Sequence, residues 1–299
     1  MERDQFELLK VGDYELFRSF SMADCLESCE RSWANLLLYG DTYCWRRAVI
    51  GNRLWIASFE EHYLFFPLGE FIKPEELKLC WQSFARQTAA DAVIGDVPET
   101  YLQHFPQAEK FLELELDMGE ADYIYDLEHL QSFAGSKLRK RHNQVRQFER
   151  EYLNRWLVKE ISFDMLDSII GFAAQQSVMY WSDSSGLEEK LAFGRLKEVW
   201  RIPEAGLAGI ALYVEDNLCG FSIYSSLDKC MVDIHFEKAD HNYRGCGAKL
   251  TAELVNHLLQ KKYAFMNREQ DLNSDGLRRA KQALDPAKLY KRWRVTAVK

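Results

Sequence analysis

The sequence has few residues that break regular structure, with 6 prolines and 16 glycines among 299 residues. Hydrophobic residues make up 47% of the chain, which is enough apolar material for a folded core and too much for a disordered protein. No stretch approaches the roughly 18 uncharged apolar residues of a membrane-spanning helix. The opening residues, 1–5, are mostly polar or charged and lack the apolar run of a secretory signal. We therefore expect a soluble, cytoplasmic globular protein.

Cysteine is scarce and shows no pairing pattern. The seven cysteines are odd in number and scattered, which favours reduced thiols over a disulfide framework. Cys25 and Cys29 would share a helix face, but neither has a histidine or a second cysteine pair nearby. Because structural zinc needs four ligands at close spacing, we predict no metal site.

Positive charge is also in the minority, since the formal net charge is -8. This balance disfavours non-specific binding to nucleic acid through overall charge. Two segments nevertheless concentrate basic residues: residues 137–146, which contain no acid, and a second group at Arg278, Arg279, Lys281, Lys288, Lys291, Arg292 and Arg294. We predict two local basic surfaces on an acidic protein.

The order of predicted elements indicates a duplication. At about 150 residues per domain, a chain of this length accommodates two domains. In the first half, three strand-like runs with a Gly51-Asn52 hairpin turn precede a helix, a strand, a helix and a closing pair of strands. The expected ranges are strands 44–50, 53–59 and 62–66, helix 74–87, strand 92–94, helix 98–105, and the strand pair 111–116 with 123–125.

The second half repeats this order after a basic helix over residues 137–152. The expected ranges are strands 207–214, 218–224 and 230–236, helix 243–260, strand 263–266, helix 274–284 and a last strand over 289–295. We therefore predict an α/β fold with mixed sheets, built from two tandem domains, residues 1–130 and 131–299. Each is a meander of strands followed by helix, strand, helix and strand.

The strongest local signal for ligand binding is the turn before the helix at 243–260. A glycine-containing turn at a helix start points backbone N–H groups outward, and the helix dipole favours an anion there. The order strand, Arg-x-x-Gly, helix resembles the donor-phosphate motif of the GNAT acyltransferases, in which Arg244 and Gly247 match and Lys249 replaces a small residue. The resemblance implies that the donor phosphates are bound by Arg244, Gly245, Cys246, Gly247 and Ala248. The alternative is an ordinary helix-start turn without a ligand.

A second resemblance extends over most of the chain. It rests on these segments: 66–69, 122–126, 137–143, 265–272, 275–281 and Asp285-Pro286. Together they resemble an uncharacterised bacterial family that is grouped with the C-terminal domain of phosphatidylglycerol lysyltransferase. This resemblance implies two GNAT-like units in tandem, similar in architecture to peptidoglycan aminoacyltransferases.

Candidate catalytic residues lie on two predicted strands. Asn267 to Asp271 form a polar run directly after an apolar strand, where ligands gather in open α/β folds. Glu269 or Asp271 is suited to take a proton from an acceptor amine. His235 and Glu237 alternate with apolar residues on their strand, as Asp233 does, and make a polar face beside the acceptor. A solvated loop and a solvated strand face are the alternatives.

Candidate substrate-binding residues are basic or polar side chains near these strands. They are Lys137, Arg139, Lys140, Arg141, Asn267, Arg268, Arg278 and Lys281. The helix at 137–146 is suited to contact phosphates of a cofactor, a lipid headgroup or the acceptor end of a transfer RNA, or it presents a solvated face. The first half lacks a phosphate loop, because Pro67 to Pro74 offer prolines and Glu70 at the equivalent turn, and we expect it to be catalytically silent.

Two functions are consistent with these features. The first is an acyl- or aminoacyltransferase, similar to phosphatidylglycerol lysyltransferase, that moves a group from acyl-CoA or aminoacyl-tRNA to an amine or hydroxyl. Its acceptor would be a small molecule or a lipid headgroup. The second is a non-catalytic metabolite-binding or scaffold protein on a duplicated acyltransferase fold.

Overall fold

The computed structural model describes residues 1–21, 27–89, 91–177 and 184–299; Cys25 lies outside these ranges. The helices are α1 (Tyr14–Ser21), α2 (Trp33–Leu38), α3 (Gly40–Tyr43), α4 (Pro74–Ala85), α5 (Glu99–His104), α6 (Leu127–Gln131), α7 (Arg139–Glu151), α8 (Leu166–Gln176), α9 (Ser184–Trp200), α10 (Cys246–Gln260) and α11 (Asp275–Gln282). None of the described helices is long and apolar enough to cross a membrane.

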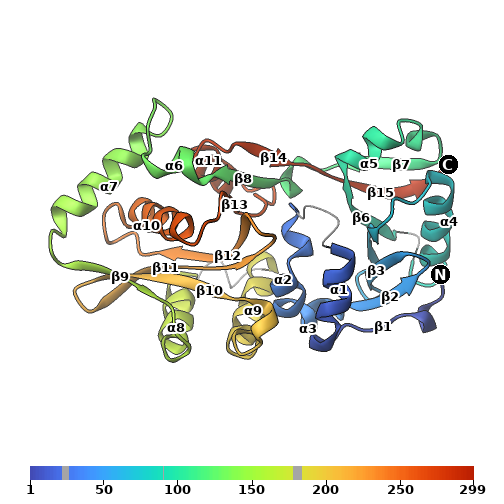
Figure 1. Cartoon of the computed structure of the whole chain (residues 1–299), viewed down its shortest axis with the longest axis horizontal. Coiled ribbons are helices and arrows are strands. Elements are labelled where there is room, and N and C mark those ends of the chain that lie inside the picture. Colours follow the sequence, from blue (N-terminus) through green and yellow to red (C-terminus); the bar gives the residue numbers. More distant parts are fainter. Residues whose placement is uncertain (22–26, 90, 178–183) are drawn as a thin grey trace.

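The strands form two mixed sheets (Figure 1). The strands are β1 (Glu7–Leu8), β2 (Arg46–Ile50), β3 (Arg53–Ser58), β4 (Tyr63–Phe65), β5 (Leu68–Gly69), β6 (Val93–Pro98), β7 (Leu112–Leu116), β8 (Asp122–Asp126), β9 (Trp156–Glu160), β10 (Ala208–Val214), β11 (Asn217–Ser226), β12 (Met231–Ala239), β13 (Phe265–Asn267), β14 (Lys288–Tyr290) and β15 (Arg292–Val298). The first sheet has the order β1-β2-β3-β4-β6-β15-β7, with β5 beside β3, and the second has the order β9-β10-β11-β12-β13-β8-β14.

These two orders correspond strand by strand. Each sheet starts with an antiparallel meander and continues through a parallel pair, β4 with β6 and β12 with β13. Each then accepts one strand from the other part of the chain: β15 lies between β6 and β7, and β8 lies between β13 and β14. The predicted fold class and the duplication are therefore confirmed, and the two sheets are joined by an exchange of strands.

The predicted hairpin turn is confirmed, whereas the predicted strand partners are partly wrong. The Gly51-Asn52 turn joins β2 to β3, with Ile50 opposite Arg53 and Gly51 in the left-handed region at φ 61°. The predicted closing pair, 111–116 with 123–125, was wrong, because β7 pairs with β15 and β8 pairs with β13 and β14. The predicted last strand is divided into β14 and β15, which belong to different sheets. Alternating side chains identify a strand but do not identify its partner.

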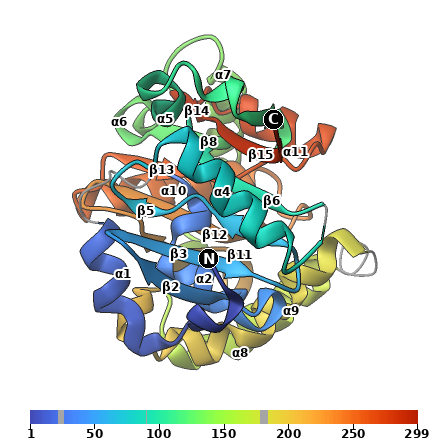
Figure 2. The same ribbon diagram turned by 90° about the vertical axis from the view of Figure 1, so that its right-hand side faces the viewer.

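Helices cover both faces of the second sheet. On one face α7 and α10 pack on apolar side chains such as Ile210 and Val232, and on the other face α8 and α9 pack on side chains such as Phe221. The latter core also contains Trp33 and Leu36 of α2, so α2 lies between the two sheets (Figure 1). Both chain termini lie at the far end of the first sheet (Figures 1 and 2). Side chains of both halves therefore meet in one of the three apolar cores, which joins Leu54 and Ile56 of β3 to Phe221 of β11.

Candidate active site

The centre of the site is the point where β12 and β13 separate. The two parallel strands pair from Met231 with Phe265 to Asp233 with Asn267, after which β13 ends and β12 continues to Ala239. The pairing of β11 with β12 shifts here, because Ile223 pairs with Phe236 but the adjacent Tyr224 pairs with Ile234. His235 is thus the extra residue of a β-bulge, a feature that bends a strand and re-aims its side chains.

Glu269 follows β13 in an uncommon backbone conformation. Its φ of 57° lies in the left-handed region, which costs a non-glycine residue about 1–3 kcal/mol. The surrounding chain holds it there: Asn267 Oδ1 accepts a hydrogen bond from the Glu269 N–H at 2.6 Å, and the Glu269 carbonyl accepts one from the Tyr123 N–H at 3.2 Å. The chain therefore fixes the direction in which the Glu269 carboxylate points.

Three ionisable side chains meet where the strands separate. His235 Nδ1 lies 3.4 Å from Asp233 Oδ2 and 3.9 Å from Glu269 Oε1. Asn35 of α2 donates from Nδ2 to both carboxylates, at 3.2 Å each, and His235 Nε2 lies 2.8 Å from Ser225 Oγ on β11. We call Asp233, His235 and Glu269 the central cluster.

Burial dominates the ionisation of the central cluster. Burial lowers the pKa of His235 to about 3, so its imidazole is neutral near pH 7. Burial and the neighbouring Glu269 raise the pKa of Asp233 well above its usual range, and burial raises the pKa of Glu269 to about 8. The local environment therefore disfavours two full negative charges at this point.

A cavity of about 360 Å³ lies beside the central cluster, at the boundary of the two halves. Its wall contains Glu269, which is the one member of the cluster that reaches it, and Asn35. Carboxylates from both halves line it, namely Glu30, Glu61, Asp96, Glu120 and Glu188 together with Glu269, and its aromatic residues are Tyr39, Tyr43, Trp45 and Tyr63. Arg292 is the single cationic residue among the described residues that line it. The lining is strongly acidic.

Arg292 lies where the two exchanged strands, β8 and β15, begin close to one another. As the first residue of β15 it lies 3.1 Å from Asp122 Oδ1, at the start of β8, and 3.2 Å from Glu30 Oε1. Asp122 also accepts hydrogen bonds from the Cys29 N–H and from Asn267 Nδ2, at 2.8 and 2.9 Å. Both charged partners at the crossing, Arg292 and Asp122, are almost completely buried. These ion pairs and hydrogen bonds therefore connect Arg292, on the cavity wall, to the start of β8, one of the two exchanged strands.

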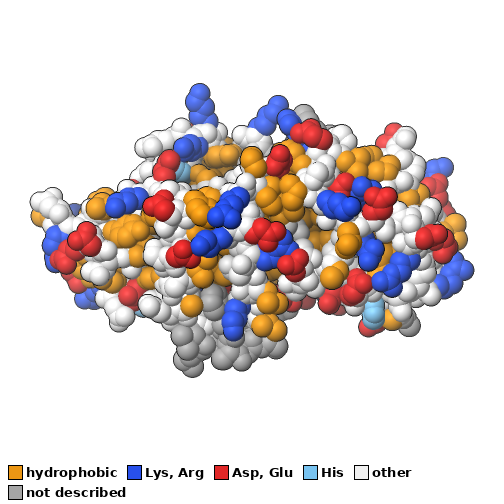
Figure 3. Space-filling view, turned by 90° about the horizontal axis from the view of Figure 1, so that it is seen from below, with side chains coloured by type: hydrophobic (Ala, Val, Ile, Leu, Met, Phe, Trp, Pro, Cys, Tyr) orange, Lys and Arg blue, Asp and Glu red, His pale blue; other side chains and the backbone are white. Residues whose placement is uncertain are grey.

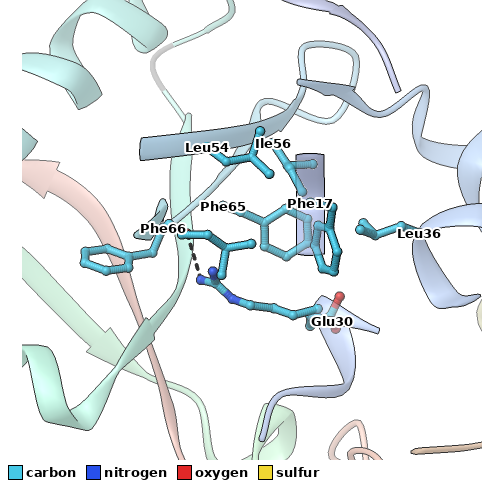
Figure 4. Close-up of a pocket in the computed structure, with 9 residues that line it drawn as sticks. Phe17, Glu30, Leu36, Leu54, Ile56, Phe65 and Phe66 are labelled. Atoms are coloured by element: carbon cyan, nitrogen blue, oxygen red, sulfur yellow. Dashed lines mark hydrogen bonds between the residues drawn. The ribbon is translucent and has the colours of Figure 1, made fainter. Parts of the chain in front are cut away.

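Arg31 fixes the neighbouring short helix, Cys29–Arg31, from inside the first half. Its Nη2 donates to the Phe66 carbonyl at 2.7 Å, the dashed line in Figure 4. Its Nε pairs with Asp96. Around this bond, Figure 4 shows the rings of Phe17 and Phe65 with other apolar side chains. The space that these side chains enclose is about 10 Å³. That space is about one water molecule and holds no substrate. Glu30, the residue before Arg31, lines both this space and the larger cavity.

Glu237 and Asp271, two predicted catalytic residues, lie in separate ion pairs. Glu237 pairs with Arg268. Asp271 accepts two hydrogen bonds from Arg278, both at 2.9 Å, and one from the Tyr123 hydroxyl at 2.8 Å. Burial would raise the pKa of Asp271, but these hydrogen bonds outweigh burial and lower it. The structure therefore brings His235 and Glu269 together but not Glu237 and Asp271.

Most of the predicted substrate-binding residues are either half-buried or exposed. Lys281 donates to the Arg268 carbonyl, and burial followed by the charge of Arg268 lowers the pKa of Lys281. Burial and the same neighbour lower the pKa of Arg141, which reaches from α7 toward Arg268 and Glu237. Arg139 and Lys140 are exposed on α7, and Lys137, also exposed, lies 2.7 Å from Asp285.

The predicted phosphate loop lies under α7. Gly245 precedes α10 at φ 84° and touches the backbone of α7 at Gln144. The buried Cys246 thiol donates to the Cys219 carbonyl at 3.0 Å, whereas Arg244 is exposed. Lys249 is buried, lies 2.7 Å from Glu149 of α7 and 2.8 Å from Glu253, and sits 3.8 Å from the Trp156 ring. Lys249, the residue that departs from the GNAT motif, therefore links α10 to α7 through its ion pair with Glu149.

Gly245→Ala should destabilise the protein by about 2 kcal/mol, because a left-handed φ disfavours alanine and the new Cβ would overlap the Gln144 carbonyl. Urea unfolding followed by circular dichroism measures this change. Gly247→Ala is the matched control, since its Cβ would lie 3.7 Å from Ala239 and the site is helical. We expect Gly247→Ala to be neutral or stabilising by up to about 1 kcal/mol. Equal effects of the two substitutions would contradict close packing of α7 on this loop.

Comparison with known proteins supplies the family. Residues 26–296 match the family model described as phosphatidylglycerol lysyltransferase, C-terminal. The chain belongs to this family. No curated protein matches the sequence.

Solved structures with the same fold have low sequence identity. A conserved protein of unknown function from Bacteroides thetaiotaomicron VPI-5482 superposes with a TM-score of 0.86 at 21% identity, over 98% of this chain and 99% of that one. The C-terminal domain of a putative lysylphosphatidylglycerol synthetase from Agrobacterium fabrum gives 0.61 at 15%, over 96% and 91%. L-PGS from Bacillus licheniformis gives 0.58 at 13%, over 94% and 91%. These likenesses support the shared tandem fold.

Several residues of the site have no counterpart among the sequence predictions. Asn35, Glu30 and Glu188 come from the first half or from α9 and line the cavity, and Ser225 fixes the His235 ring. Asn35 carried a usable signal, since it is the polar residue in the apolar run of α2, Trp33–Leu38. A buried polar side chain requires a partner, so this position pointed to a polar contact. The others carry no such local pattern.

Proposed function

We propose that the chain is an acyl- or aminoacyltransferase that uses the acidic cavity to hold an amine-bearing substrate. Its reaction forms an amide or ester bond between the carbonyl carbon of the donor and an acceptor amine or hydroxyl. The thiol of coenzyme A or the ribose hydroxyl of a transfer RNA leaves. The observation that carries the proposal is the position of Glu269 on the cavity wall, at the separation of β12 and β13.

The charge of the cavity supports an amine-bearing substrate. Among the described residues six carboxylates line it, of which Glu30 pairs with Arg292, Asp96 with Arg31 and Glu120 with Arg294. The other three, Glu61, Glu188 and Glu269, have no lysine or arginine partner among the described residues. An ammonium group gains attraction from the remaining carboxylates, and the aromatic rings offer faces to a cation. Glu269 Oε1 contacts Asn35 and His235, which leaves Oε2 for the proton of the acceptor.

The surface of α7 favours an aminoacyl-tRNA donor over an acyl-CoA. Gly245 of the predicted phosphate loop and Lys249, which follows the loop, both contact α7. These contacts reduce the room for a pyrophosphate at the loop. Arg139 and Lys140 extend from the same helix into solvent and are available to phosphates of a large polyanion. On the face shown in Figure 3, in contrast, acidic and basic side chains alternate among apolar ones.

Charge reversal on α7 tests the donor. Lys140→Glu should weaken binding of aminoacyl-tRNA and reduce the slope of log affinity against log salt by about 1, because one phosphate contact is lost. Fluorescence anisotropy with labelled tRNA, repeated over a series of salt concentrations, measures both. Arg18→Glu, on the exposed surface of α1, is the matched control and should change neither.

Two further measurements separate the alternative donors and the non-catalytic alternative. Calorimetry with acetyl-CoA and the Arg244→Glu variant tests the other donor, and binding that Arg244→Glu abolishes would identify the acyl-CoA reaction instead. Mass spectrometry after incubation with donor and an amine library tests turnover. Binding of a donor without any product would favour a non-catalytic metabolite-binding protein. If folded protein binds neither donor, the transferase proposal is wrong.

A further inference from the structure

The central cluster contains buried polar atoms without a hydrogen-bond partner. They are Asp233 Oδ1, His235 Nδ1 and, on the adjoining α2, Asn35 Oδ1. The side chains of Asp233 and His235 are 0% and 1% exposed, so water does not reach them freely. Buried polar groups are normally paired, and an unpaired imidazole nitrogen facing two carboxylates is a costly arrangement without a ligand.

The side chains of the central cluster are placed to coordinate a cation, with His235 Nδ1 3.4 Å from Asp233 Oδ2 and 3.9 Å from Glu269 Oε1. One ligand atom each from Asp233, His235 and Glu269 lies within 4.8 Å of the others, and the His235–Asp233 pair is 3.4 Å apart. Tetrahedral zinc with bonds of about 2.1 Å places its ligand atoms about 3.4 Å apart. His235 Nε2 is held by Ser225 Oγ at 2.8 Å, and when Nε2–H donates this bond the Nδ1 lone pair faces the carboxylates.

The charge around the cluster also favours a divalent cation. The connected carboxylates are those of Asp96, Asp122 and Asp233, which are buried, and those of Glu30 and Glu269, whose side chains are 38% and 25% exposed. The cations among them are Arg31, Arg292 and Lys281. In their ionised forms these groups leave an excess of two negative charges. At the margin Glu237 pairs with Arg268, and Arg294 is shared by the carboxylates of Glu115, Asp117 and Glu120, so the margin adds no positive charge. A divalent cation would neutralise this excess.

We infer that Asp233, His235 and Glu269 form a binding site for a divalent transition-metal ion of the zinc class. One imidazole nitrogen with two carboxylates suits such an ion better than magnesium or calcium, which prefer oxygen ligands alone. Three protein ligands leave a further coordination position, and the cavity beside Glu269 gives access to it. There the ion would polarise the acceptor or donor oxygen as a Lewis acid. The proposed site differs from the sequence prediction of no metal, which considered only ligands at close spacing along the chain.

Metal binding is measurable without any knowledge of the transfer reaction. The full chain, freed of metal by chelator and dialysis, is titrated with Zn²⁺ in a calorimeter and with Co²⁺ in an absorption spectrometer. We expect one ion per chain, a visible ligand-field band from Co²⁺, and a Zn²⁺-dependent increase in melting temperature. Asp233→Asn and His235→Gln should each lower the Zn²⁺ affinity by about 100-fold or more.

The control is His257→Gln, which removes a histidine that lies 2.8 Å from the Tyr224 hydroxyl, outside the cluster. Its affinity for Zn²⁺ should match that of the unmodified chain. Circular dichroism establishes that each variant is folded, and Asp233→Asn preserves the side-chain shape. Absence of stoichiometric Zn²⁺ and Co²⁺ binding by folded protein would overturn the inference, as would binding that survives both substitutions in the cluster. Because binding is read without turnover, failure here leaves the transferase proposal to its own experiment.

Discussion

Arg292→Leu is expected to lower the free energy of unfolding by about 3–5 kcal/mol, because it leaves buried carboxylates without their cation. Arg292 is 4% exposed and lies 3.1 Å from Asp122 and 3.2 Å from Glu30, and its Nε donates to the Glu120 carbonyl at 3.0 Å. Asp122 keeps its hydrogen bonds from Cys29 and Asn267 but loses the only guanidinium that contacts it among the described residues. Urea unfolding at neutral pH measures the loss.

Arg294→Leu is the matched control on the same strand. Arg294 is 24% exposed and pairs with Glu120 at 3.0 Å, and a pair of this exposure contributes about 1 kcal/mol or less. In Arg292→Leu/Asp122→Asn, the second substitution removes one of the uncompensated charges and should restore part of the lost stability. Similar losses for Arg292→Leu and Arg294→Leu would show that the strand crossing does not depend on its buried ion pair.

The fold was predictable from sequence up to the identity of the strand partners. Alternating apolar residues and the Gly51-Asn52 turn indicated the meanders and their helices, because these depend on neighbouring residues. The exchange of β8 and β15 depends instead on contacts between residues far apart, such as Asp122 with Arg292. Each exchanged strand has the same local pattern as a strand that stays in its own half. The local sequence therefore could not predict that β8 and β15 pair with strands of the other half.

The candidate site was predictable residue by residue but not as a cluster. Glu269 and His235 were identified because polar side chains follow or interrupt apolar strands. Glu237 and Asp271 had the same local signal, yet their side chains bind Arg268 and Arg278. The β-bulge at His235 breaks the simple alternation that had placed Asp233, His235 and Glu237 on one face. Spacing along a strand therefore could not separate the cluster from its neighbours.

Glu269→Gln is expected to reduce the rate of acyl transfer by about 10²–10⁴-fold while leaving the protein folded. Glutamine keeps the length of the side chain and its hydrogen bonding to Asn35, but it cannot accept the proton of the acceptor. The Glu269 N–H and carbonyl bonds that hold its left-handed backbone do not involve the substituted group. Single-turnover rates with saturating donor, compared with donor affinity, would separate a loss of chemistry from a loss of binding.

Glu99→Gln, an exposed carboxylate on α5, is the control and should leave the transfer rate unchanged. A Glu269→Gln variant that retains more than about one tenth of the rate would contradict any catalytic role, since positioned proton transfer contributes at least about 100-fold. Loss of donor affinity with an unchanged single-turnover rate would instead make Glu269 a binding residue. The predicted outcome, a large fall in rate with donor affinity intact, requires that Glu269 act on the acceptor. That action is what its place on the cavity wall, beside Asp233 and His235, supports.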